Sequence, residues 1–187
     1  GMTFRAVSYT LFLGGKATYA GCKIHLDGDD SRFTADIGYL GTGDRTFDFN
    51  YDALQTGRRT VSNMNADGVL QDRSAKLFRG TIDFQKGAAG SKGDEKEDVL
   101  LLGEDVVNRT IPLILCAEEN VVGNHGATIG ELDDETLFYF ESRGISRAQA
   151  ENILARASIE RFARTVDDEV LRAQILQTLE EELNDDV

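Results

Sequence analysis

The segment Leu77-Phe-Arg-Gly-Thr-Ile-Asp-Phe84 alternates between two kinds of side chain with a period of two. One face of the extended chain carries Phe78, Gly80, Ile82 and Phe84, and the other carries Leu77, Arg79, Thr81 and Asp83. Since successive side chains of a strand point to opposite faces, the segment predicts a strand with one buried face. Residues 46–51 alternate in the same way, with Phe47, Phe49 and Tyr51 on one face.

Turn-forming residues divide the chain up to about Ile129 into many short strands. The predicted turns are Gly14-Gly15, Asp27–Asp30, Gly41–Asp44 and Ala66–Gly68. Such spacing fits a sandwich, a barrel or a parallel β-solenoid, and we find no residue-level repeat of fixed length. The continuous apolar runs Val99–Leu102 and Ile111–Cys116 favour the solenoid, because strands covered on both faces have such runs.

Residues 85–98 combine glycine, small residues and mixed charge. We interpret them as an exposed, mobile connection between strands. Their glycines, Gly87, Gly90 and Gly93, are not followed by the lysine and hydroxyl pair of a P-loop. The sequence therefore predicts no nucleotide site there.

Helical signals begin after Ile129. Asp133 or Asp134 is expected to cap a short helix that Gly144 ends, and Ser146-Arg-Ala-Gln149 is a capping box for a second helix. A third helix is predicted to begin at Thr165–Asp168, with its apolar stripe at Leu171, Ile175, Leu179 and Leu183. Its acidic end is expected to be solvated and comprises Glu180, Glu181, Glu182, Asp185 and Asp186.

Composition limits the possible functions. The 187 residues are 41% hydrophobic, enough for one domain or one domain with an appendage. The formal charge of −13 repels phosphates, so we expect neither nucleic acid nor an anionic membrane as a partner. Two cysteines, no apolar leader and no run of about 18 apolar residues predict a cytoplasmic protein.

The stretch Gly123-Asn-His-Gly-Ala-Thr-Ile-Gly130 presents a single histidine among small residues. Gly123, Gly126 and Gly130 permit positive φ or a close approach of another chain's backbone. His125 has two interpretations: a histidine near a strand end that only makes hydrogen bonds, or a ligand shared with a second chain. In the second case a neutral imidazole would complete the coordination of iron whose thiolates come from elsewhere.

The cysteines carry no complete metal site in the sequence. Cys22 and His25 are three residues apart, so on a strand they face opposite sides, with Cys22 in the core and His25 on the surface. Cys116 ends an apolar run and is expected to be a buried structural cysteine. No paired cysteine motif for zinc or an iron–sulfur cluster is present, and no serine sits in a nucleophile elbow.

Residues 110–146 resemble the carboxy-terminal signature of SufB and SufD, the scaffold proteins of the Suf iron–sulfur cluster assembly system. The resemblance runs from Thr110-Ile-Pro-Leu-Ile-Leu-Cys116 through Gly123-Asn-His-Gly126 to Ser142-Arg-Gly-Ile-Ser146, and Phe78–Phe84 is similar too. It implies a right-handed parallel β-helix over residues 2–130 and a helical region over residues 131–187. It also implies a scaffold rather than an enzyme, with a nascent cluster forming between SufB and SufD and the helical region docking the ATPase SufC.

The resemblance assigns expectations to individual residues. His125, with Asn124 beside it, matches the family histidine at the interface and would bind metal only together with partner thiolates. Ile159 stands where SufB carries a cysteine implicated in cluster assembly, so the chain is SufD-like and is expected to hold no cofactor stably by itself. A transient iron–sulfur cluster would form only with a SufB-like partner, and an exposed strand edge near Phe4 would favour a homodimer.

Two other interpretations remain open. The first is a stand-alone oligomeric β-helix binding module without cluster chemistry, which a buried and fully hydrogen-bonded His125 would favour. The second is a β-helix enzyme acting on polysaccharide, for which the clustered carboxylates would be Asp27, Asp29, Asp30 and Asp36. These aspartates are better explained as turn residues.

Overall fold

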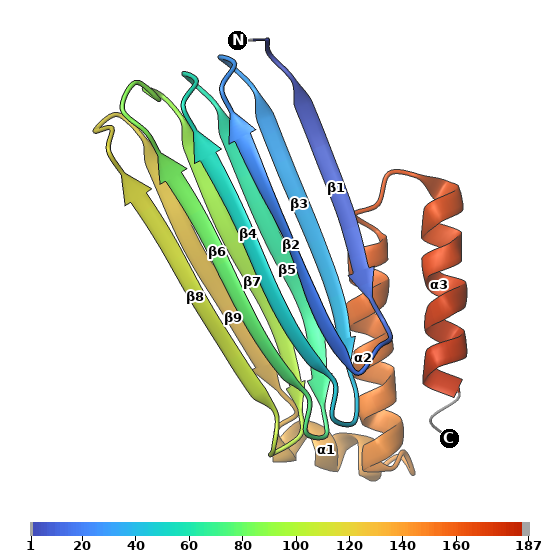
Figure 1. Ribbon diagram of the computed structural model, residues 1–187. Helices are drawn as coiled ribbons and strands as arrows, with labels where there is room; N and C mark the ends of the chain where they lie inside the picture. The colour runs from blue at the N-terminus through green and yellow to red at the C-terminus, as the bar shows by residue number, and fades with distance from the viewer. Residues whose placement is uncertain (1, 185–187) are drawn as a thin grey trace.

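The computed structural model describes residues 2–184, with side chains as far as Glu182; Leu183's side chain, Asp185 and Asp186 therefore lie outside the described part of the chain. Nine strands form two parallel sheets in which the chain passes alternately from one sheet to the other (Figure 1). The five-stranded sheet contains β1 (Arg5–Phe12), β3 (Arg32–Gly41), β5 (Val61–Gln71), β7 (Lys92–Leu102) and β9 (Val122–Glu131). The four-stranded sheet contains β2 (Ala17–Leu26), β4 (Thr46–Gln55), β6 (Ala75–Phe84) and β8 (Val107–Cys116). The predicted parallel β-solenoid is confirmed.

The coils of the solenoid differ in length. Partner residues are 29 positions apart where Thr46 pairs with Ala75, but 32 positions apart where Ala75 pairs with Val107. The difference is absorbed in the turns, because the strands themselves stay in register along each sheet. This variation explains why no repeat of fixed length is visible in the sequence.

One corner of the solenoid is a ladder of left-handed residues. Asp30, Arg59 and Gly90 lie above one another with φ of 62°, 55° and 80°. The amide of Asp30 donates to the carbonyl of Arg58 at 2.9 Å, and the amide of Arg59 donates to the carbonyl of Ala89 at 3.1 Å. These turns thus satisfy backbone amides with carbonyl groups of the next coil.

The lumen between the sheets is filled by the inward positions of the alternating strands. Phe78, Ile82 and Phe84 are fully buried in it, together with Phe47, Phe49 and Tyr51, as their period-two pattern predicts. The predicted turn at Ala66–Gly68 is wrong, because these residues lie inside β5. Gly68 is needed there for packing, since a Cβ at this position would collide with the ring of Tyr39.

Three helices follow the strands: α1 (Asp134–Glu141), α2 (Arg147–Ala163) and α3 (Glu169–Asn184). The side chain of Asp133 caps α1, and the capping box of Ser146 and Gln149 is formed at the start of α2. Asp168 accepts hydrogen bonds from the amides of Val170 and Leu171 at the start of α3. These predicted helix starts are confirmed.

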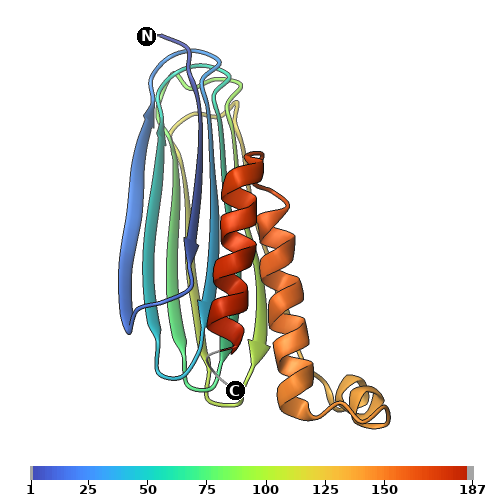
Figure 2. The same ribbon diagram turned by 90° about the vertical axis from the view of Figure 1, so that its right-hand side faces the viewer.

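The helices α2 and α3 lie side by side against the solenoid, and α1 lies beyond one end of α2 (Figure 2). Leu102 packs with Ala155 and Ile159 of α2, and Leu179 of α3 is buried in the same cluster. The run Val99–Leu102 is therefore covered by the lumen on one face and by helix on the other, as predicted. None of the helices described is long and apolar enough to span a membrane.

The run Ile111–Cys116 was also predicted to be covered on both faces, and that prediction is wrong. It lies in β8, the last strand of the four-stranded sheet. Ile111, Leu113 and Leu115 are 54%, 46% and 42% exposed. They alternate with the inward residues Thr110 and Ile114, and they are left uncovered because the helices pack on the other sheet.

Candidate functional site

His125 lies on β9, the last strand of the five-stranded sheet, at the open end of the lumen. The register pairs it with Glu95 on β7, whose side chain is completely buried in the lumen. His125 Nδ1 lies 3.6 Å from Glu95 Oε1, and the imidazole is 29% exposed. The ring therefore points into the mouth of the solenoid rather than outward from the sheet.

Asn124 and the glycines near His125 have different structural surroundings from the histidine. Asn124 points to the opposite face, where its side-chain amide donates to Asp94 at 2.7 Å. Gly123 serves the chain's own packing, since a Cβ there would lie 2.7 Å from Ile114. A Cβ on Gly126 would meet nothing within 4 Å, and one on Gly130 would make only ordinary contact with Leu100. None of the three glycines has positive φ, so that predicted role is wrong; the space beside Gly126 is open within the chain.

A buried ion pair lies in the lumen beneath the histidine. Lys76 on β6 binds the carboxylate of Glu97 on β7, and both side chains are at most 1% exposed. Thr110 on β8 donates to the same carboxylate and lies 3.1 Å from Lys76 Nζ. Burial lowers the pKa of Lys76, and the negative charge of Glu97 opposes that shift. The geometry supplies the hydrogen bonds that a buried ion pair needs.

Glu95 is buried beside this pair without a partner of its own. Neither carboxylate oxygen has a hydrogen bond within the described residues. Burial, followed by the charge of Glu97, raises the pKa of Glu95 to about 7, although Lys76 acts in the opposite direction. A carboxyl with this pKa changes its protonation state near neutral pH, as groups at functional sites often do.

The interpretation of residues 85–98 as a mobile connection is wrong for residues 92–98, and it did not identify Glu95 and Glu97 as buried carboxylates. These residues belong to β7, with Glu95 and Glu97 inward and Lys92, Lys96 and Asp98 on the outer face. The error arose because the inward positions are charged rather than apolar. Period two is still present, since acidic residues and glycine alternate with the outward residues, and this signal could have identified the strand.

The prediction for Cys22 is confirmed, and the prediction for Cys116 is wrong. Cys22 packs against the lumen cluster while His25 is exposed, as their spacing predicts. Cys116 is exposed rather than buried, because it ends the uncovered strand β8. Ile159 lies fully buried between α2 and the sheet. Within the described residues, no three His, Cys, Asp or Glu side chains gather as metal ligands.

The clustered aspartates considered for glycoside chemistry behave as structural residues. Asp29 accepts from the amide of Arg58, Asp30 pairs with Arg59, and Asp27 accepts from Thr56, each bridging one coil to the next. Asp36 lies on β3 and accepts from Asn65 at 2.7 Å, and burial raises its pKa. The carboxylates thus stabilise successive coils, as their interpretation as turn residues predicts for the first three.

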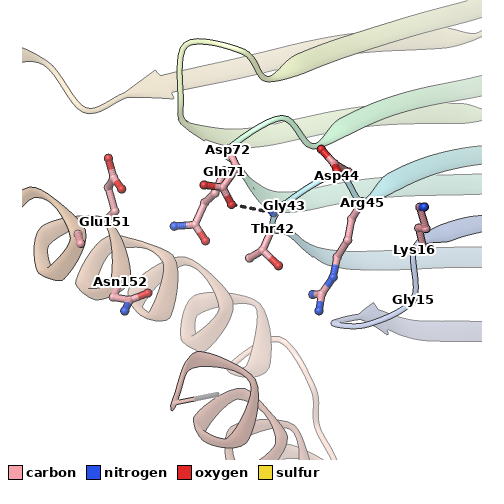
Figure 3. Close-up of a pocket in the computed structure, with 11 residues that line it drawn as sticks. Gly15, Lys16, Thr42, Gly43, Asp44, Arg45, Gln71, Asp72, Glu151 and Asn152 are labelled. Carbon is pink, nitrogen blue, oxygen red and sulfur yellow. Dashed lines mark hydrogen bonds between the residues drawn. The ribbon is translucent and has the colours of Figure 1, made fainter. Parts of the chain in front are cut away.

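A separate polar cleft of about 750 Å³ lies where the turns of the solenoid meet the start of α2 (Figure 3). Its lining residues are Gly15, Lys16, Thr42, Gly43, Asp44, Arg45, Gln71, Asp72, Ala148, Glu151 and Asn152. Its charges are mixed, and the carboxylate of Asp72 is already engaged by the amide of Gly43 at 2.7 Å. The cleft is not part of the His125 site, and no local sequence pattern predicts it.

Comparison with known proteins gives a consistent result. The family model described as "SUF system FeS cluster assembly, SufBD core domain" matches residues 4–158. The iron–sulfur cluster assembly protein SufD of Bacillus subtilis is 24% identical over 156 residues, which cover 83% of this chain and 36% of that protein. SufD of Escherichia coli is 25% identical over 178 residues, which cover 95% of this chain and 42% of that protein. A SufBD family protein of Staphylococcus saprophyticus is 27% identical over 154 residues. The chain thus spans well under half the length of the curated relatives that it matches.

Proposed function

The chain belongs to the SufBD family of iron–sulfur cluster assembly proteins, and from that premise we propose that it is a SufD-like scaffold subunit. It would hold partner proteins in place and contribute His125 to a cluster site that another chain completes. The cluster is then cargo of the assembly rather than a resident cofactor. The work of this chain is to position a ligand and to provide docking surfaces, not to turn over a substrate.

The observation that carries this proposal is the setting of His125. The imidazole is partly exposed at the mouth of the lumen and makes no hydrogen bond within the described residues, so its metal-binding nitrogen is not committed elsewhere. A buried, fully hydrogen-bonded histidine would have favoured the binding module without cluster chemistry, and that condition is not met. With no ligand set in residues 2–184 to complete a cluster, thiolates from a SufB-like partner fit what is missing.

The pairing surface that the structure favours is the β8–β9 end of the solenoid. β8 and β9 are the last strands of their sheets, so their backbone groups are open to another chain. The uncovered apolar residues of β8 lie beside them, namely Val107, Ile111, Leu113 and Leu115. At the other end, Phe4, Ala6 and Phe12 pack against the chain's own core, which leaves less apolar surface for the homodimer expected near Phe4.

The helices supply a second docking surface. Exposed apolar side chains stand on all three, namely Phe138, Tyr139, Ile153, Val170 and Leu171. A SufC-like ATPase docking here would cover apolar surface that the solenoid does not use. This assigns the helices to one partner and the β8–β9 end to the other.

The partner assignment is tested by pull-down with separately expressed SufC-like and SufB-like proteins. Deletion of everything after Arg164 would remove Leu179, which is buried in the core, so exposed single substitutions are the sharper test. Val170→Lys and Phe138→Lys should reduce retention of the SufC-like protein. Gln177→Lys adds the same charge at another exposed position of α3 and should not.

The role of His125 is tested by cluster reconstitution on the assembled complex. His125→Ala should lower the yield of cluster without loss of partner binding, because it removes a ligand and no core contact. His25→Ala removes the other, exposed histidine and is the matched control. An unchanged cluster yield with His125→Ala would exclude the histidine as a ligand.

A further inference from the structure

Glu95 lies in a space that the lumen keeps free for it. A Cβ on Gly80 of β6 would collide with the Glu95 carboxylate, so the glycine leaves the space that the carboxylate occupies. The neighbouring carboxylate, Glu97, is held by Lys76 and Thr110, whereas both oxygens of Glu95 lack a hydrogen bond within the described residues. A buried acceptor without a donor is costly, and a candidate donor is the imidazole of His125, one coil away.

The donor that the fold offers is His125 Nδ1. In the register between β7 and β9, His125 pairs with Glu95. The distance from His125 Nδ1 to Glu95 Oε1 is 3.6 Å. This distance exceeds that of a hydrogen bond by several tenths of an ångström, so the bond requires the imidazole to move closer to the carboxylate. The other nitrogen, Nε2, is the one not directed at Glu95.

We propose that Glu95 is a positioning residue that accepts the Nδ1 proton of His125 and thereby leaves the Nε2 lone pair for a metal ion. A neutral imidazole carries one N–H, so the nitrogen that donates to the carboxylate fixes which nitrogen is free to bind. Metal-binding histidines commonly donate their second nitrogen to a carboxylate, which orients the ring and raises its basicity. The inference rests on the proposed function, since it describes how His125 would be held for iron.

The tautomer of His125 tests this inference without any metal or partner. Nitrogen-15 NMR of the full chain at about pH 8, where imidazole is neutral, distinguishes a protonated Nδ1 from a protonated Nε2. His25 is the only other histidine and serves as an internal reference, and His125→Ala assigns the signals. We expect His125 to carry its proton on Nδ1.

Two variants separate positioning from packing. Glu95→Gln keeps an oxygen that can accept from Nδ1 and should retain the tautomer, whereas Glu95→Leu should shift His125 towards protonation at Nε2. Asp52→Asn removes a carboxylate on β4 of the other sheet and should change nothing. A wild-type chain with the proton on Nε2, or a Glu95→Leu chain with an unchanged tautomer, would overturn the proposal. Thermal unfolding of each variant shows whether it is folded, and the tautomer of the wild-type chain carries the test if Glu95→Leu is not.

The consequence for metal binding is measured on the reconstituted complex. Glu95→Leu should weaken iron retention about tenfold or more, as for other residues that orient a metal-binding histidine, while Glu95→Gln should retain most of it. Equal retention in both variants would overturn the positioning role. If His125→Ala leaves cluster yield unchanged while the tautomer behaves as expected, the failure belongs to the proposed metal role and not to the Glu95–His125 contact.

Discussion

At the scale of single residues, the lumen of this solenoid contains charge where a core normally contains only apolar side chains. Lys76 and Glu97 form an ion pair, and Thr110 donates a hydrogen bond to Glu97. The carboxylate of Glu95 has no hydrogen bond within the described residues. Its raised pKa records the free energy of keeping a carboxylate away from water. Stability should therefore depend on pH through this residue.

Glu95→Gln is expected to stabilise the chain at alkaline pH. The folded pKa of about 7 lies above the ordinary 4.5, so the folded state binds this proton more tightly, and the stabilisation is lost as pH rises through about 7. The variant should gain about 1–3 kcal/mol in the free energy of unfolding at about pH 8.5, and the gain should shrink as pH falls towards 5. Urea denaturation at several pH values measures it. A gain that is constant with pH would show that folding does not raise the pKa of Glu95, because Lys76 and His125 compensate for burial and for the charge of Glu97.

Lys76→Met is expected to lower the free energy of unfolding by about 3–5 kcal/mol, because it leaves Glu97 charged and buried without its partner. The double variant Lys76→Met with Glu97→Gln should recover much of that loss. Chemical denaturation of the two single variants and the double variant gives the coupling energy. Additive losses would mean that the two side chains do not stabilise each other.

At the scale of the elements, the helices complete the core. α2 and α3 cover the outer face of the five-stranded sheet, where Leu40, Val69 and Leu102 would otherwise be exposed. The four-stranded sheet has no such cover, and its last strand keeps an apolar outer face. Continuous apolar runs thus occur both in the buried strand segment Val99–Leu102 and in the uncovered strand β8.

Leu179→Ala is expected to lower the free energy of unfolding by about 2–5 kcal/mol, since the side chain is fully buried between α3 and the sheet. Gln177→Ala on the exposed side of the same helix should change it by less than about 0.5 kcal/mol. Thermal and chemical unfolding compare the two. Equal, small effects would mean that α3 does not contribute to the core in solution.

At the scale of the whole molecule, the solenoid has two ends and they differ. The β8–β9 end carries His125 and the exposed apolar side chains of β8, while at the other end Ala6 and Phe12 of β1 pack against the core and Val7 is exposed. A surface that combines these features is suited to pairing with an equivalent edge of another chain.

Self-association of the isolated chain is expected to be lost in Leu113→Lys and retained in Val7→Lys. The two side chains are 46% and 42% exposed, on β8 and β1 respectively, so they place the same charge at opposite ends of the solenoid. Analytical ultracentrifugation at several concentrations measures the oligomeric state. The reverse result would assign pairing to the edge near Phe4, and a wild-type chain that stays monomeric would restrict this surface to a different partner.

Local patterns in the sequence predicted much of this architecture. The alternation in Leu77–Phe84 determined which side chains enter the lumen, and Asp133 and Ser146 marked where α1 and α2 begin, because strand facing and helix capping depend on residues near in sequence. The resemblance to SufB and SufD placed the chain in its family, and that placement is confirmed. His125 could be selected as a candidate because its glycine-rich surroundings are visible without a fold.

Only the tertiary structure decided which side chains each strand contacts in the neighbouring coils and helices. Whether an apolar run is covered, as at Val99–Leu102, or left open, as in β8, depends on where the helices pack. The pairing of Glu95 with His125 joins residues 30 positions apart through a register that varies from coil to coil. The charged alternation of β7 concealed a buried strand, because the partners that allow its burial are Lys76 on β6 and Thr110 on β8. These contacts are set by the stacking of coils, which no local pattern specifies.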